Sequence, residues 1–476
     1  MELVCLTDRC HLGFSNSNIL IRLLDMTPSP SGPRGPYSKL FALRRLRKRP
    51  IEFVMEMAQR YGDLVRFGSW RNPVVFVNHP DMVRELLVSR TEDFVRADSV
   101  RNALRIFDGE SILVSEGDQW RQQRRLLQRG FRSELLRAYA RTAVEYTQEM
   151  LQQWPSAGTI CVSDDMTGLF MQTLSHVLFG QQAPPDLAAS IRTVLDARAE
   201  ETADAISVGH RRPKTFRRKR DQALAHVHNF FDDLIRRRRT RTEEHGDLLG
   251  LLIEANRKDV GAARRQSQVD RQIRDEMISM INASLDAMIA AMGWTLYLVS
   301  KHSDVQTRLH REIEDRLDKP AVVDVNRVEL PFAEMVVHES LRLYPPNWML
   351  ITRRSIRESS LGGNQIPKGS WVYVFPYVIH RDARWFSTPD LFDPDRFAPE
   401  RLGAVQRSAY IPLGLGPHVC IGKALSTIIL TSIMACILQN FRLAILPEQA
   451  EMVAEVSVVM RPSNDLRLIV KRHGPG

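Results

Sequence analysis

Apolar residues recur about every 3.6 positions from Arg132 to about Val322, and this period predicts a chain that is mostly helical. Prolines at Pro155, Pro184-Pro185 and Pro213 divide this stretch, because proline cannot continue a helix without losing a backbone hydrogen bond. Runs that favour strands are short and lie outside it. We therefore expect a mainly α fold with small β-sheets.

The expected strands flank this helical stretch. Leu64–Phe67 and Val74–Val77 are rich in β-forming residues and enclose a Gly/Asn/Pro turn, which predicts a hairpin. Pro80–Ser89 has the start of a capped helix. A further β-rich run, Ser370–Tyr377, follows the turn residues of Ile366–Gly369.

Length and composition favour one large domain. A chain of 476 residues can form about three domains, yet 43% hydrophobic residues suit a single large core and no strong repeat is visible. The one linker-like stretch, Thr27–Pro36, lies near the N-terminus. We predict a leader over residues 1–27, a Pro-rich segment over 28–36 and a catalytic domain over 37–476.

The leader does not predict a membrane span. Five charged residues interrupt it, and its longest uncharged run is Cys10–Ile21, whereas a span needs about 20 mostly apolar residues. It also lacks the basic and apolar regions of a signal peptide. Met277–Ser300 carries a single charge, Asp286, near its middle, which is typical of a buried core helix.

The five cysteines are few, odd in number and without C-x-x-C spacing. This usage argues against a disulfide framework or a structural zinc site and favours the reducing cytoplasm.

The formal charge of +10 is concentrated in the basic runs 44–49, 211–220 and 236–239. Such runs can bind nucleic acid, but no recognition motif accompanies them, so we interpret them as solvated surface and expect no nucleic acid. Arg121, Arg125 and Arg129 repeat every fourth residue and are candidates for docking an acidic protein.

The segment Leu413-Gly-Leu-Gly-Pro-His-Val-Cys-Ile-Gly422 carries the strongest chemical signal. Its glycines and proline favour a tight turn, and a helix-compatible run, Lys423–Leu438, follows. Amides at the start of that helix would stabilise a Cys420 thiolate, the form that binds metal. The alternative is an inert buried thiol.

This segment resembles the haem-binding signature of the cytochrome P450 family, Phe-x-x-Gly-x-Arg-x-Cys-x-Gly. Gly416, Cys420 and Gly422 match it, whereas Leu413 replaces the Phe and His418 replaces the Arg. The resemblance implies that Cys420 is the axial thiolate of a haem b iron, which favours O–O cleavage. It also implies that His418 hydrogen-bonds a haem propionate, with a charge that depends on pH.

Two further motifs resemble the same family. Glu339 and Arg342, three apart, resemble its Glu-x-x-Arg pair, and Arg396 follows in Phe-Asp-Pro-Asp-Arg-Phe. By this resemblance the three form a buried charge triad that holds the cysteine loop in place. Trp120 and Arg124 share one helical face and resemble its propionate clamp.

Another propionate-binding arginine is expected in the segment that leads to the β-rich run. Arg353 occupies its place by resemblance, and Arg354 stands beside it, so the choice between the two is open.

The predicted core helix is similar to the family helix that crosses the haem face. Ala283–Met288 aligns with the (Ala/Gly)-Gly-x-(Asp/Glu)-Thr-Thr motif of that helix. This chain retains the acid as Asp286 but has Ala287 in place of the oxygen-activating threonine. Dioxygen activation consumes two protons, and alanine cannot donate one. Three routes remain: a substrate hydroxyl, a water held by Asp286 and Ser284, or peroxide chemistry that needs no relay.

The resemblance implies the cytochrome P450 fold and a monooxygenase that hydroxylates or epoxidises an apolar small molecule with O2. The substrate would bind between the Asp286 helix and Asn347–Thr352. Electrons would come from a separate acidic protein, a ferredoxin or flavodoxin with its reductase. The alternative within enzymes is a haem-thiolate peroxygenase or isomerase, and a haem sensor is a third reading.

Overall fold

The computed structural model describes residues 32, 38–68, 73–207, 212–240, 246–256, 263–316, 329–463 and 465–473. The predicted leader and all of the predicted Pro-rich segment except Gly32 lie outside the described residues.

Helices make up most of the described chain, as the apolar period predicts. They are α2 (Ser38–Lys48), α3 (Pro50–Tyr61), α4 (Pro80–Arg84), α5 (Asp98–Asp108), α6 (Gly117–Leu127), α7 (Ser133–Gln152), α8 (Val162–Phe179), α9 (Pro185–Ile206), α10 (Lys214–Thr240), α11 (Leu248–Ala255), α12 (Ala263–Lys301), α13 (Ser303–Arg316), α14 (Pro331–Leu343), α15 (Pro376–Ile379), α16 (Ala404–Ala409) and α17 (Lys423–Asn440). Short 3₁₀ or π turns are η1 (Glu85–Ser89), η2 (Thr91–Asp93), η3 (Gln128–Phe131), η4 (Pro394–Phe397), η5 (Gly416–His418) and η6 (Pro447–Gln449).

Four small sheets accompany the helices. The largest has the order β1-β2-β8-β5-β3, built from Leu64–Phe67, Val74–Val77, Trp371–Val374, Arg353–Ser355 and Phe94–Arg96. A second sheet joins β4 (Ala157–Cys161), β12 (Arg467–Arg472) and β9 (Phe441–Ile445). Two hairpins complete the set, β6 (Ser359–Leu361) with β7 (Asn364–Ile366) and β10 (Ala454–Val456) with β11 (Met460–Pro462).

The predicted hairpin is confirmed, because β1 and β2 pair antiparallel with Leu64 opposite Val77. The prediction for Ser370–Tyr377 is partly wrong, since β8 ends at Val374 and Pro376 begins α15. Proline favours the first turn of a helix and cannot donate to a strand ladder. The expected helix over Pro80–Ser89 is α4 followed by the π turn η1.

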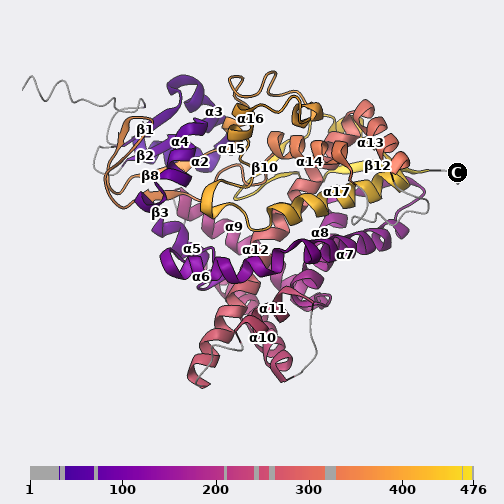
Figure 1. The fold of residues 1–476 in the computed structure, drawn as a ribbon, viewed down its shortest axis with the longest axis horizontal. Coiled ribbons are helices and arrows are strands. Elements are labelled where there is room, and N and C mark those ends of the chain that lie inside the picture. Colours follow the sequence, from indigo (N-terminus) through magenta and orange to yellow (C-terminus); the bar gives the residue numbers. More distant parts are fainter. Residues whose placement is uncertain are drawn as a thin grey trace, which may run out of the picture.

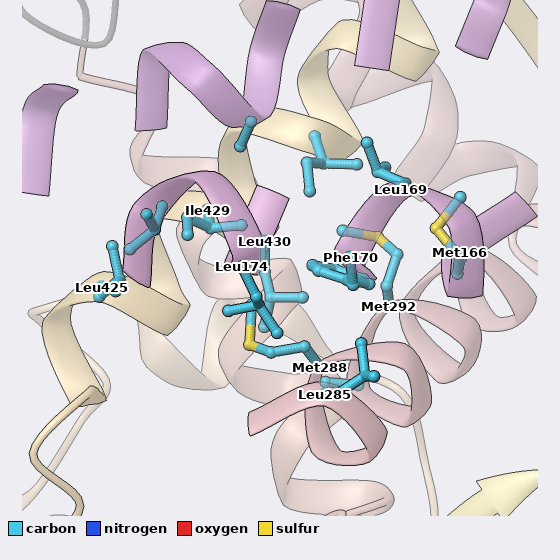
Figure 2. Close-up of a cluster of buried hydrophobic side chains, with 14 of the residues drawn as sticks. Met166, Leu169, Phe170, Leu174, Leu285, Met288, Met292, Leu425, Ile429 and Leu430 are labelled. Carbon is cyan, nitrogen blue, oxygen red and sulfur yellow. The ribbon is translucent and has the colours of Figure 1, made fainter. Parts of the chain in front are cut away.

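The long helix α12 crosses the middle of the molecule, with α17 beside it and the five-stranded sheet at the left of the view in Figure 1. The side chains of α8, α12 and α17 meet in one buried cluster (Figure 2). Leu285 and Met292 of α12 are almost fully buried there. Burial of each such side chain stabilises the fold by about 1.5–3 kcal/mol.

Two segments of the described chain, Gln266–Lys301 and Lys423–Asn440, are long and apolar enough to cross a membrane by length and composition alone. Most of each apolar window is buried inside the protein, 72% and 61% respectively. This is the burial expected of core helices, in agreement with the prediction for Met277–Ser300.

Several charges of the basic runs form ion pairs between helices. Arg47 of α2 lies 2.7 Å from Asp204 of α9, and Arg212 reaches the same carboxylate at 2.7 Å. Arg238 of α10 pairs with Asp247 at 2.7 Å, and Arg239 pairs with Asp270 of α12 at 2.6 Å. These arginines therefore help to hold α2 against α9 and α10 against α12.

Candidate active site at the cysteine loop

The cysteine loop lies between α16 and α17 and is shaped by two glycines in the left-handed region. Gly414 and Gly416 have φ angles of 79° and 72°, which residues with a Cβ rarely adopt. The Gly414 N–H donates to the Ile411 carbonyl at 3.1 Å, and the Cys420 N–H donates to the Leu413 carbonyl at 2.9 Å. The loop thus closes on itself and delivers Cys420 three residues before α17.

Cys420 is exposed to an internal cavity rather than to the outer surface. Burial raises the pKa of its thiol, while the Gly422 N–H and the Arg124 guanidinium act in the opposite direction. The expected stabilisation by helix-start amides is therefore present, but it does not outweigh burial in the free protein. A cation at the sulfur is needed to make the thiolate dominant.

The cavity has a volume of about 630 Å³ and runs between the cysteine loop and α12. Cys420 and Leu425 line one side, and Ala283 and Ala287 line the other. Met349–Thr352, within the predicted substrate-contacting segment, forms another part of the wall. Most of the lining is apolar, which favours an apolar ligand.

A cationic group lies at one side of this cavity. Five residues of this group line the cavity. Four of them were predicted from sequence, namely Trp120, Arg124, Arg353 and His418, and the fifth is Arg96 of β3. Trp120 packs on His418 with ring centroids 4.0 Å apart. The structure therefore brings together residues from three distant parts of the sequence, namely α6, β5 and the cysteine loop.

Arg353 and Arg354 point to different surroundings. Arg353 is 8% exposed and lines the cavity, where burial and the Arg96 charge lower its pKa to about 10. Arg354 instead pairs with Asp98 at 2.7 Å. The geometry favours Arg353 for an anionic group in the cavity.

His418 differs from the expectation of a pH-dependent charge. Burial, together with Arg96, Arg353 and Arg124, lowers the pKa of His418 to about 2, so the ring is neutral. Arg96 lies 3.0 Å from Nδ1, and because arginine only donates, Nδ1 accepts. The proton is therefore on Nε2, which remains free to donate to an acceptor in the cavity.

The donors in this group fit an anionic cofactor edge. Among the described residues, neither Arg124 nor Arg353 forms an ion pair or a side-chain hydrogen bond with the protein, although Arg353 is buried. Uncompensated buried cations are costly, so carboxylates from a ligand would stabilise both. Haem carries two propionates, and its iron could be held by Cys420.

The predicted charge triad is assembled and buried. Arg342 donates to both oxygens of Glu339 at 2.7 and 2.8 Å, and Arg396 lies 3.4 Å from the same carboxylate. Glu339 and Arg342 are 0% exposed. The remaining donors of Arg342 and Arg396 bind backbone carbonyls of residues 380 and 387–391.

Asp286 and Ser284, on α12, line the cavity but are already engaged. Asp286 accepts from Arg192 of α9 at 2.9 Å, and the Ser284 hydroxyl donates to the Met280 carbonyl at 2.6 Å. The Ser284 oxygen can therefore accept, but its proton is committed. Ala287 offers no polar atom.

Sequence reasoning missed Arg96 and Arg192. Arg96 donates to the Ser115 carbonyl at 2.7 Å and pairs with Glu116 at 3.3 Å, which fixes it beside His418. One indication of its burial was present, because Arg96 lies two residues after Phe94 and so shares a strand face with this apolar side chain. Nothing in the sequence indicated that Arg192 would meet Asp286.

Comparison with known proteins agrees with this geometry. The family model for Cytochrome P450 matches residues 30–470. The chain belongs to the cytochrome P450 family. Its P450 fold is shared with the crystal structure of the cytochrome P450DA heme domain (TM-score 0.81, 22% identity, 94% and 98% of the two chains) and with retinoic acid bound cyanobacterial CYP120A1 (TM-score 0.79, 22% identity, 94% and 100%).

Relatives among curated P450 proteins include bacterial oxygenases. Cyclooctat-9-en-7-ol 5-monooxygenase from Streptomyces melanosporofaciens is 30% identical over 84% of this chain and 86% of its own length. Pentalenene oxygenase from Streptomyces avermitilis is 25% identical over 91% and 95%. This P450 is accordingly an oxidoreductase of the monooxygenase type with a haem cofactor.

Proposed function

We propose that this P450 inserts one atom of O2 into an apolar, cyclic small molecule by hydroxylation or epoxidation, with haem b between Cys420 and α12. The observation that carries the proposal is that Cys420 and the Ala283–Ala287 stretch line the same cavity of about 630 Å³. Bound haem supplies dioxygen activation, and thiolate ligation favours O–O cleavage. Arg124, Arg353, Trp120 and His418 would hold the propionates, with Arg96 orienting His418.

The substrate class follows from the apolar lining and from the relatives. Two of the relatives are named as oxygenases of cyclooctat-9-en-7-ol and of pentalenene, which are cyclic compounds. We infer a cyclic terpene or terpene alcohol for this chain too. It would bind between α12 and the Asn347–Thr352 segment, and residues of both line the cavity.

The test has two parts. The reduced, CO-bound protein should show the red-shifted Soret band of thiolate ligation, and Cys420→Ala should abolish it. Pentalenene and cyclooctat-9-en-7-ol should then be screened for a shift in the haem spectrum, and turnover under ¹⁸O₂ should place one ¹⁸O atom in the product. A mutant that keeps the band would refute the ligand assignment.

A second candidate is a haem-thiolate peroxygenase or isomerase, which needs no external electrons. Ala287 favours it, because the chain supplies no hydroxyl at the position of the oxygen-activating threonine, and the Ser284 proton is committed to Met280. Turnover with peroxide alone, compared with turnover that needs NAD(P)H and a donor, distinguishes the two. A haem sensor would bind no organic ligand at the haem.

The electron donor we propose is an acidic ferredoxin or flavodoxin with its reductase. Arg121, Arg125 and Arg129 are exposed, and Arg124, on the same helix as the first two, reaches the cavity beside Cys420. A donor on this face would therefore lie close to the haem edge. Arg125→Glu with Arg129→Glu should slow electron transfer at low salt and weaken its salt dependence.

We place the protein in the cytoplasm, without a membrane span or a nucleic-acid partner. Among the described residues, Cys420 and Cys436 are free thiols. Their state suits a reducing compartment. Fractionation of cells that express the full chain tests the location.

A further inference from the structure

His380, at the end of α15, is buried between the charge triad and the cysteine loop. Its side chain is 0% exposed and packs against the ring of Tyr410, with centroids 5.6 Å apart. Nδ1 lies 3.0 Å from the Arg342 carbonyl, and Nε2 lies 3.0 Å from the Ile411 nitrogen. The imidazole thus bridges the last turn of α14 and the start of the cysteine loop.

The hydrogen-bond roles of this ring are fixed by its partners. The Ile411 N–H can only donate, so Nε2 accepts, and the single proton of the neutral ring is on Nδ1 and goes to the Arg342 carbonyl. Burial and the Arg342 charge lower the pKa of His380 to about 3, so the ring stays neutral at physiological pH. Arg342 donates back to the His380 carbonyl at 2.7 Å.

Backbone hydrogen bonds connect Ile411 to the residue that carries the sulfur, Cys420. The Ile411 carbonyl accepts from Gly414 at 3.1 Å, and the neighbouring Leu413 carbonyl accepts from Cys420 at 2.9 Å. A shift of Ile411 therefore moves both ends of the turn that presents Cys420. Within the described part of the chain, the side chains of Arg342 and Arg396 hydrogen-bond to Glu339 and to backbone carbonyls of residues 380 and 387–391, and these partners lie outside the loop.

We propose that His380 is the positioning residue that transmits the rigidity of the Glu339–Arg342 pair to the cysteine loop, through its Nε2 bond to Ile411. This rests on the proposed role of Cys420 as haem ligand. The competing explanation is that His380 merely fills space beside Tyr410.

Two substitutions separate these explanations in the haem-loaded protein. In His380→Gln the amide oxygen reaches the place of Nε2 and can still accept from Ile411, whereas in His380→Asn the amide nitrogen reaches only the place of Nδ1. His380→Gln should keep the thiolate Soret band of the CO complex. His380→Asn should lose at least half of it to the form without thiolate ligation, at similar haem content.

Hydrogen exchange over residues 410–420 gives a readout that does not depend on activity. Exchange should be about tenfold faster in His380→Asn and within about twofold of the parent protein in His380→Gln. His310→Asn, a change at another buried histidine, is the control and should leave this segment unchanged.

Equal loss of the band in both variants, or retention in both, would overturn the positioning role. In the parent protein the Ile411 and Gly414 amides should exchange as slowly as the core of α14, and rapid exchange would overturn the role without any variant. Absence of the thiolate band in the parent protein would instead refute the haem-ligand assignment.

Discussion

Adjacent arginines on α6 face different surroundings. Arg124 lines the cavity and lacks a protein partner among the described residues, whereas Arg125 is exposed. Arg124→Leu should weaken haem binding by about 2 kcal/mol, or more than tenfold, because a charge-assisted hydrogen bond to a propionate is lost. Haem content after dialysis, measured by absorbance, checks this.

Arg125→Leu is the matched control, with the same change one residue along the helix. It should retain the haem content of the parent protein. Equal losses in the two variants would show that α6 presents a different face to the cofactor.

Asp286 is held by Arg192, which ties an acidic side chain of α12 to α9. Asp286→Asn should slow product formation about tenfold or more with little change in substrate affinity, because the carboxylate would act only during the reaction. Single-turnover rates and spectral titrations separate the two effects.

Ala287→Thr tests which proton route operates. A restored hydroxyl should raise the fraction of reductant that ends in product if water fills the space of the missing threonine side chain. Little gain, or blocked binding, would indicate that a substrate hydroxyl occupies that space. Peroxide-driven turnover that is indifferent to both changes would favour the peroxygenase.

Residues with a local pattern were predictable, and residues that act across the fold were not. Trp120 and Arg124 share a helical face, so their meeting in the cavity follows from a four-residue spacing. Arg96 reaches His418 from a strand 322 positions away in the sequence. No spacing rule predicts such a contact, because it depends on how β3 packs against the loop.

At the scale of elements, α14 is joined to η4 by a buried carboxylate, because Glu339 of α14 lies 3.4 Å from Arg396 of η4. Glu339→Gln should destabilise the protein by about 3–5 kcal/mol, because two buried guanidinium groups lose their counter-charge. Thermal unfolding of the haem-loaded protein measures this.

Glu455→Gln is the comparison, since its pair with Arg461 is exposed, at 45% and 39%, and spans 3.2 Å. Removing an exposed pair should cost less than about 1 kcal/mol. A similar loss in both variants would mean that burial does not set the contribution of the triad.

Element types were predictable where one period dominates. The 3.6-residue pattern located the helices between Arg132 and Val322, but β4 within that stretch was missed. This short strand is stabilised by pairing with β12, more than 300 residues later, so its cause is tertiary.

At the scale of the whole molecule, a buried acid and two buried histidines have opposite effects on how the free energy of unfolding changes with pH. Burial raises the pKa of Glu276 to about 8, and burial lowers the pKa of His310 and His338 to about 4. Below pH 6.5 the unfolded histidines bind protons that the folded ones do not, so stability falls as pH falls. From pH 4.5 to 8 the folded Glu276 binds a proton that the unfolded one does not, so stability falls as pH rises.

Stability should therefore be greatest near pH 6.5. Glu276→Gln should flatten the decline toward pH 8, which for one proton is at most about 1.4 kcal/mol per pH unit. Melting temperatures over pH 5–9 measure both effects. An unchanged alkaline slope in the variant would place the responsible group elsewhere.

The cysteine loop is seated on a distant segment of the chain. A Cβ atom at Gly416 would overlap the Leu87 carbonyl oxygen of the π turn η1, and Val88 lies beside it. The cysteine loop, residues 411–422, therefore depends on residues 80–89 for its shape. A chimaera that takes the loop from a relative without residues 80–89 would lose the fit at this contact, which supports the turn that carries Cys420.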